Sequence, residues 1–260
     1  MEWTEAINEQ VERLKPIVIN DGLKERILGL IDFTRLNKDD TEDRLAVWCQ
    51  QAQNRYGHVA AVCVYPPFVR LMAANFAGSP IKVATVTNFP EGEHKLEDVL
   101  IEINRALADG ANEIDMVFPY HRYLAGERQY AKTFIETCKA ACGDKVLLKV
   151  ILETGALADS TIIADAAYDV IAAGADFIKT STGKISEGAT FEAVATILLV
   201  IKHVQGKIER PLGIKVAGGV KDLQQALLYL ELADNIMGRE WTTEQTFRIG
   251  SSKLVEEILK

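Results

Sequence analysis

The chain has 260 residues, of which 48% are apolar and 25% are charged, and its formal net charge is −8. This length and composition suit one large folded domain and exclude an intrinsically disordered chain. The negative charge argues against nonspecific nucleic-acid binding, although it leaves room for a local basic pocket that binds a phosphate.

No segment of the sequence predicts secretion or membrane insertion. Residues 1–5 are acidic and lack the apolar core of a signal peptide. No apolar run approaches the roughly 18 residues of a membrane span. The four cysteines have neither metal-ligand nor disulfide-framework spacing, and Cys138 and Cys142 share a helix face without a second Cys or His pair. We therefore expect a cytoplasmic protein with no metal site and no membrane partner.

In chain order, a helical N-terminal extension is predicted over residues 1–28, interrupted around Asn20-Asp21-Gly22. Short apolar strands then alternate with amphipathic helices of period 3.6. The eight predicted strands are Leu30–Phe33, Val59–Tyr65, Ile81–Thr87, Glu113–Phe118, Leu147–Glu153, Phe177–Thr180, Gly213–Ala217 and Asn235–Gly238. Helices are predicted at residues 41–54, 67–77, 96–107, 127–141, 159–173, 190–204 and 221–232, with a last helix from near Ser251.

Eight strand–helix units predict a (β/α)8 TIM barrel over residues 29–260. No linker rich in Pro, Gly or Ser divides the units, so one domain over residues 1–260 is expected. The alternative is an open, doubly wound sheet. It is disfavoured because the eighth unit completes the barrel and no glycine-rich dinucleotide-binding fingerprint appears.

A weak internal repeat relates three strands. Gly110–Asp115 matches Gly174–Lys179, and Ala233–Met237 matches the last five positions of both. If the registers correspond, Asp115, Lys179 and Met237 occupy equivalent points on strands four, six and eight. Alternate strands of a barrel supply one interior layer. The repeat therefore predicts that Asp115 and Lys179 lie close together inside the barrel.

Five charged residues lie within predicted strands, in the middle or toward the C-terminal end, where barrel active sites are found. They are Asp32, Asp115, Lys149, Lys179 and Lys215. Taken alone, each of these residues could equally well face outward from its strand or inward into the barrel. Taken together inside a barrel, three lysines against two aspartates leave one surplus positive charge, which the release of one proton would balance. Lys179 is the best candidate to become neutral, and Lys215 the best candidate to stay charged.

Lys179 follows the apolar residues Phe177 and Ile178 and precedes a polar loop. Burial lowers the pKa of a lysine, and a neutral amine is a nucleophile that forms Schiff bases with carbonyl compounds. The surroundings of Lys179 therefore indicate covalent chemistry on a carbonyl substrate.

Three turns rich in small residues are predicted to converge beside the last strands. They contain Thr182, Gly183 and Lys184; Gly218 and Gly219; and Gly250, Ser251 and Ser252. Barrel loops at this position often bind phosphate through backbone N–H groups, and a lysine adds a point charge. Gly183-Lys184 is no Walker A motif, because Ile185 follows it. We expect a phosphate site at these turns.

Four segments together resemble deoxyribose-phosphate aldolases: Asp115–Pro119, Leu147–Gly155, Phe177–Lys184 and Lys215–Val220. The resemblance extends from about Leu30 to about Leu254. It implies reversible cleavage of 2-deoxy-D-ribose 5-phosphate to acetaldehyde and D-glyceraldehyde 3-phosphate, with no metal or organic cofactor. In that reaction Lys179 would form the Schiff base, and Asp115 with Lys215 and a water would move protons.

The remaining candidate residues have lesser expected roles. Asp32 and Lys149 belong to the supporting charge network, and Thr34 is expected at the barrel mouth. Cys63 is interpreted as a small core residue; the alternative is a thiol within reach of reactive aldehydes.

The sequence departs from the family in two places. Lys253 stands where the family has a second serine, and Val216 replaces the commoner Pro or Ala. Backbone donors survive both changes, so phosphate binding is expected to persist, whereas Lys253 either contacts the phosphate or faces solvent. Two other functions stay open: a Schiff-base aldolase for another phosphorylated sugar, and a barrel that binds a sugar phosphate without catalysis. The expected partners are small sugars and aldehydes, and the resemblance suggests a homodimer.

Overall fold

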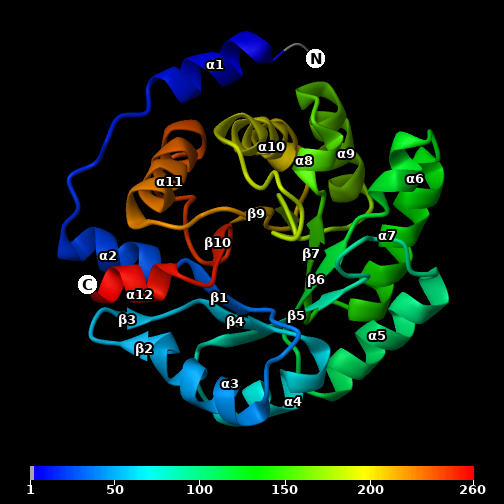
Figure 1. The fold of residues 1–260 in the computed structure, drawn as a ribbon. Helices are drawn as coiled ribbons and strands as arrows, with labels where there is room; N and C mark the ends of the chain where they lie inside the picture. The colour runs from blue at the N-terminus through cyan, green and yellow to red at the C-terminus, as the bar shows by residue number, and fades with distance from the viewer. Residues whose placement is uncertain (1–2) are drawn as a thin grey trace.

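Eight parallel strands form a closed barrel ringed by helices (Figure 1). The strands are β1 Ile31–Arg35, β4 Ala61–Val64, β5 Lys82–Thr87, β6 Glu113–Val117, β7 Leu147–Ile151, β8 Phe177–Lys179, β9 Gly213–Ala217 and β10 Phe247–Ser251. β1 pairs in parallel with both β4 and β10, which closes the ring. This computed structural model confirms the predicted (β/α)8 barrel and rules out the open sheet. It describes residues 3–260, so the first two residues of the predicted extension lie outside the described part.

Helices cover the outside of the barrel. They are α3 Glu42–Trp48, α4 Val69–Asn75, α5 Leu96–Ala108, α7 Arg128–Cys142, α9 Ser160–Ala172, α10 Phe191–Val204, α11 Leu223–Met237 and α12 Leu254–Leu259, with the short α6 Tyr120–Leu124 and α8 Thr154–Leu157. Several begin at a residue whose side chain accepts a backbone N–H bond, such as Asp159, Thr190 and Asp222. A small hairpin of β2 Gln53–Asn54 and β3 Gly57–His58 lies outside the barrel.

The predicted eighth strand at Asn235–Gly238 is wrong. Residues up to Met237 belong to α11, and the eighth barrel strand is β10. The helical spacing of buried residues continues through Leu230, Ala233 and Ile236, so the apolar run that resembled a strand is one helix face. Met237 therefore does not occupy a strand position equivalent to those of Asp115 and Lys179. The other two copies of the repeat do match, since each has a glycine of positive φ before its strand.

Side chains along the strands alternate between two environments. On β9, Ile214 and Val216 point outward into the apolar layer beneath the helices, whereas Lys215 points inward. On β10, Phe247 and Ile249 also point outward, whereas Arg248 points inward. The apolar core of this molecule therefore lies mainly between strands and helices, and ionic groups fill part of the barrel interior.

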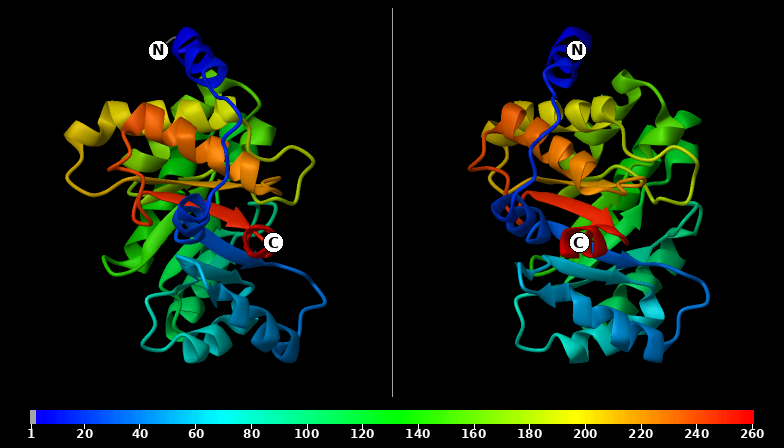
Figure 2. Two further views of the ribbon diagram at one scale, coloured as in Figure 1. Left: turned by 90° about the vertical axis from the view of Figure 1, so that its left-hand side faces the viewer. Right: turned by 60° about the vertical axis from the view of Figure 1, so that its left-hand side comes forward.

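The N-terminal segment contains two helices, α1 Thr4–Glu12 and α2 Asp21–Leu28. An extended stretch joins them, with α1 lying against α10 and α11 at one edge of the molecule (Figures 1 and 2). The side chain of Asn20 caps α2 by accepting a hydrogen bond from the backbone N–H of Leu23, which explains the predicted interruption at Asn20. Over residues 3–260, no helix has the length and apolar character needed to cross a membrane.

Candidate active site

Lys179, Asp115 and Lys215 meet inside the barrel. Lys179 ends β8, and Asp115 and Lys215 are the middle residues of β6 and β9. Lys179 Nζ lies 2.8 Å from Asp115 Oδ2, and Lys215 Nζ lies 2.6 Å from the same oxygen. The predicted proximity of Asp115 and Lys179 is confirmed. Lys179 is only 3% exposed, yet it reaches the wall of a pocket at the barrel mouth.

The surroundings of Lys179 favour its neutral form. Burial lowers the pKa of the amine below its ordinary value, Asp115 opposes this shift, and the positive charge of Lys215 reinforces it. Burial would also lower the pKa of Lys215, but the carboxylates of Asp115 and Asp32 outweigh it and raise the pKa. Lys215 therefore keeps its proton while Lys179 can lose one, as the charge count predicted.

Seven ionic side chains form a continuous charge network through the barrel. They are Asp32, Glu113, Asp115, Lys149, Lys179, Lys215 and Arg248. Sequence reasoning missed two of them: Arg248 lies on the unrecognised eighth strand, and Glu113 is the first residue of β6. The two omissions cancel, because four cations against three carboxylates still leave one surplus positive charge.

The predicted supporting residues occupy the centre of this network. Lys149 Nζ donates to Glu113 Oε2 at 2.5 Å and to Asp115 Oδ1 at 2.9 Å. Asp32 Oδ2 lies 2.6 Å from Lys215 Nζ. Although burial alone would raise the pKa of Asp115, its three lysine neighbours hold that pKa well below the ordinary range. The charges of Lys215, Lys149 and Arg248 likewise lower the pKa of Asp32 against the effect of burial, so both aspartates are ionised at neutral pH.

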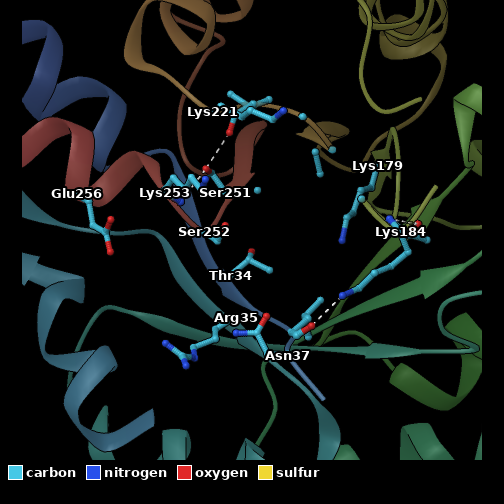
Figure 3. Close-up of a pocket in the computed structure, with 18 of the residues that line it drawn as sticks. Thr34, Arg35, Asn37, Lys179, Lys184, Lys221, Ser251, Ser252, Lys253 and Glu256 are labelled. Carbon is cyan, nitrogen blue, oxygen red and sulfur yellow. Dashed lines mark hydrogen bonds between the residues drawn. The ribbon is translucent and has the colours of Figure 1, made fainter. Parts of the chain in front are cut away.

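The mouth pocket has a volume of about 360 Å³ and lies at the C-terminal ends of the strands (Figure 3). All eight predicted phosphate-site residues line it: Thr182, Gly183, Lys184, Gly218, Gly219, Gly250, Ser251 and Ser252. Thr34 and Lys179 also line it. The structure thus brings the three predicted turns together around the amine of Lys179.

Backbone geometry leaves N–H groups free at these turns. Gly218 and Gly219 have φ of 90° and 85°, a region that suits glycine. Within residues 3–260, the N–H groups of Gly219 and Ser252 have no hydrogen-bond acceptor, so they are available to an anion. Gly250 has a second function, because a Cβ there would lie 3.0 Å from Lys215 Cε. It makes room for the Lys215 side chain.

Basic side chains surround the pocket. Among the described residues, its lining contains five basic side chains and one carboxylate: Arg35, Lys179, Lys184, Lys221, Lys253 and Glu256. Arg35 is paired with Asp40 at 2.6 Å, and Lys184 Nζ donates to the Leu36 carbonyl at 2.8 Å. Lys253 lines the pocket and is also exposed to solvent. The local positive charge contrasts with the net charge of −8.

Several pocket residues escaped sequence reasoning. Arg35 is the last residue of β1, Asn37 and Lys221 lie in the loops after β1 and β9, and Trp48 is the last residue of α3. The position of Arg35 and Asn37 shortly after the predicted strand Leu30–Phe33 was an available signal.

Glu153 was also missed, because it was read only as part of the predicted fifth strand. It has a left-handed backbone, and its buried carboxylate accepts hydrogen bonds from the backbone N–H and hydroxyl of Thr182. Burial raises the pKa of Glu153, and the two bonds from Thr182 oppose the shift. It holds the loop that follows Lys179.

Cys63 on β4 is fully buried in a small apolar cluster with Leu36, Ala84 and Val86. Burial raises the pKa of its thiol, so it stays protonated at neutral pH and is a weak nucleophile. This environment favours the core interpretation. Over residues 3–260, no group of three or more His, Cys, Asp or Glu side chains is arranged to hold a metal ion.

Known proteins share both the sequence pattern and the fold. The family model for DeoC/LacD family aldolases matches residues 26–230. A Toxoplasma gondii protein assigned as a deoxyribose-phosphate aldolase is 27% identical with a TM-score of 0.83, over 92% of this chain and 93% of that one. A Coccidioides immitis protein with the same assignment is 26% identical with a TM-score of 0.79, over 100% and 97%. The tetrameric Aeropyrum pernix deoxyribose phosphate aldolase, 24% identical with a TM-score of 0.73 over 98% and 96%, shares the fold.

Proposed function

Because the chain belongs to the DeoC/LacD family of aldolases, we propose that it reversibly cleaves 2-deoxy-D-ribose 5-phosphate to acetaldehyde and D-glyceraldehyde 3-phosphate. This is a reaction of deoxyribose phosphate catabolism. One observation carries the proposal: the buried amine of Lys179, 2.8 Å from Asp115, lies in the wall of a pocket with free backbone N–H groups and basic side chains.

In the proposed reaction, the neutral amine of Lys179 attacks the C1 aldehyde of the open-chain sugar. Loss of water gives an imine, which is then protonated. The protonated imine accepts the electron pair of the C2–C3 bond as that bond breaks, which a bare aldehyde does poorly. The resulting enamine takes a proton at carbon, and hydrolysis releases acetaldehyde and restores the amine.

Asp115 and Lys215 are proposed to move protons in these steps. Asp115 contacts both amines through one oxygen, so it is placed to relay a proton between Lys179 and Lys215 with a bound water. The same pair would take the proton from the C3 hydroxyl as the bond breaks. Lys215 remains charged between steps because Asp32 and Asp115 stabilise its ammonium.

The phosphate of the substrate is proposed to bind at the three turns. The N–H groups of Gly219 and Ser252 would donate to its oxygens, and Lys221 and Lys253 would add positive charge. This contact holds the three-carbon half of the sugar, so binding energy remote from the reacting bond aligns that bond with Lys179.

The donor aldehyde gives the decisive assay. We expect the purified protein to condense acetaldehyde with D-glyceraldehyde 3-phosphate, and to cleave 2-deoxy-D-ribose 5-phosphate in reverse. A different phosphorylated-sugar aldolase would instead need a larger donor, such as a phosphorylated ketone. A protein that only binds sugar phosphates would give no product with any donor, and either result contradicts the proposal.

We further propose a cytoplasmic homodimer. All four cysteines are free and buried, which suits a reducing compartment. The mass in solution, measured by light scattering, tests the assembly, and a monomer would contradict it.

A further inference from the structure

We propose that Arg248 and Glu113, at the opposite end of the barrel from the mouth pocket, are positioning residues that set the charge balance of the interior and thereby keep Lys179 reactive. This inference rests on the proposed function, because it takes Lys179 as the imine-forming amine. Neither residue lines the mouth pocket; both line a separate cavity of about 640 Å³ beside Gly29 and Lys82, where strands begin.

Arg248 binds two carboxylates. Its guanidinium donates to Asp32 Oδ1 at 2.6 Å and to Glu113 Oε1 at 3.0 Å, and its Nε donates to the Glu244 carbonyl. Lysines contact the same two carboxylates: Asp32 Oδ2 lies 2.6 Å from Lys215 Nζ, and Glu113 Oε2 accepts from Lys149 at 2.5 Å as well as from Arg248 at 3.3 Å. Arg248 therefore competes with the lysines for the same negative charge. It is 3% exposed, so water screens this competition little.

The cations of the network differ in how many carboxylates they contact. Within residues 3–260, Lys149 contacts three, and Lys215 and Arg248 contact two each. Lys179 contacts one, through an oxygen that it shares with Lys215. Four cations against three carboxylates leave one surplus charge, and Lys179 is the least supported cation. Its proton is therefore the easiest to release.

Other ionisable groups near Lys179 do not change this ranking. Cys63 on β4 is buried and keeps its proton. Glu153, after β7, is occupied by hydrogen bonds from Thr182. Burial and Lys215 lower the pKa of Lys179 while Asp115 raises it. Arg248 and Glu113, at the end of the barrel opposite the mouth pocket, alter the balance of these contributions to the pKa of Lys179.

Substitutions at the far end have opposite predicted signs. Arg248→Met leaves three cations against three carboxylates, so the surplus disappears and Lys179 keeps its proton to higher pH. Glu113→Gln leaves four cations against two carboxylates, so Lys179 releases its proton at lower pH. The double variant Arg248→Met/Glu113→Gln has three against two and restores the original surplus of one.

The test is the pH dependence of covalent trapping at Lys179 in the full chain. Acetaldehyde and cyanoborohydride convert the imine to a stable N-ethyl lysine, and peptide mass mapping quantifies it. We expect the pH midpoint to rise by roughly one unit in Arg248→Met and to fall in Glu113→Gln. The double variant should return to the wild-type midpoint. A rise of one unit lowers trapping at neutral pH by up to roughly tenfold.

Arg26→Met is the matched control. Arg26 forms a two-pronged ion pair with Asp234 outside the barrel interior, so its loss should leave the midpoint unchanged. If Arg248→Met does not fold, Glu113→Gln and the double variant still decide the matter. Unchanged midpoints in all folded variants, or a double variant that departs further than either single one, would overturn the inference. Wild-type protein that is never labelled at Lys179 would instead overturn the proposed function.

Discussion

At the scale of single residues, Asp115 Oδ2 is the atom that couples the two lysines of the site. It accepts from Lys179 at 2.8 Å and from Lys215 at 2.6 Å. The ionised carboxylate supports both ammonium groups, so it works against the loss of a proton from Lys179. Burial and the charge of Lys215 overcome this opposition. We propose that Lys179 is reactive because the barrel interior contains more cationic side chains than carboxylates to pair with them.

Lys215→Leu should therefore raise the pKa of Lys179. The substitution removes a nearby positive charge and leaves Asp115 to Lys179 and Lys149, and both effects favour the protonated amine. We expect the pH profile of imine trapping to move upward by about 1–3 units, with slower trapping at neutral pH. Lys139→Leu is a suitable control, because Lys139 pairs with Asp176 away from the barrel interior at 2.7 Å. An unchanged profile in Lys215→Leu would refute the role given to its charge.

Five interior charges could be predicted from the sequence because each interrupts an apolar strand. Glu113 could not, since it begins its strand and looked like a boundary residue. Arg248 could not, since its strand was placed elsewhere. The direction of the Lys179 shift was still predictable, because the two missed groups have opposite charge.

At the scale of elements, two loops at the barrel mouth support each other. Gly188, between β8 and α10, packs directly on the turn after β9. A Cβ at Gly188 would lie 2.3 Å from the Gly218 carbonyl oxygen, which is shorter than any tolerated contact. The N–H of Ala189 also donates to that oxygen at 2.9 Å. The position of the Gly218-Gly219 turn thus depends on a neighbour without a side chain.

Gly188→Ala should weaken phosphate binding by displacing this turn. We expect KM for the phosphorylated sugar to rise by roughly tenfold, about 1.4 kcal/mol of binding. Activity on the unphosphorylated sugar should change much less. Gly206→Ala is the control, since nothing lies within 4 Å of a Cβ there. Equal losses with both sugars would show that the loop contact serves the whole site rather than the phosphate.

Seven strands were predicted close to their observed positions, because each is an apolar run that follows a recognisable helix end. The eighth was misplaced for a physical reason. In β10 a buried arginine interrupts the apolar run at its second position, while the end of α11 offers a more apolar stretch. Local hydrophobicity favours α11, whereas Arg248 can be buried in β10 because it pairs with Asp32 and Glu113 across the barrel.

At the scale of the whole molecule, the barrel is an apolar shell around an ionic centre. Such a centre is costly to desolvate and is stable only while every group keeps its partners. The pKa values of Asp32 and Asp115 are lowered in the folded state, because lysine and arginine charges outweigh the burial that alone would raise them. The unfolded chain thus binds protons more readily than the folded one in acid.

The stability contributed by these aspartates is present above the unfolded pKa of about 3.9 and is lost as pH falls toward the folded values. We expect the free energy of unfolding, measured by urea titration, to decline steeply below about pH 4. Asp32→Asn should reduce this steepness as well as the stability itself, because it leaves cations unpaired. Asp109→Asn, which disrupts a surface pair with Arg70, should leave the steepness unchanged. Identical acid profiles in wild type and Asp32→Asn would contradict the account.

The barrel and the position of its site were predictable because strand ends converge in any closed (β/α)8 fold. The residues that line the pocket were less predictable from the sequence. Arg35, Lys221 and Trp48 enter it from a strand end, a loop and a helix whose positions depend on packing across the barrel. Their contribution becomes visible only when the strands are closed in three dimensions.

The central claim is that one buried lysine forms a covalent imine with the substrate. Borohydride reduction in the presence of acetaldehyde, followed by peptide mass mapping, tests it most directly. We predict one added ethyl group, on the peptide that contains Lys179, with Lys179→Met abolishing the label. An added ethyl group on any other peptide, or an equal label in Lys179→Met, would contradict the account.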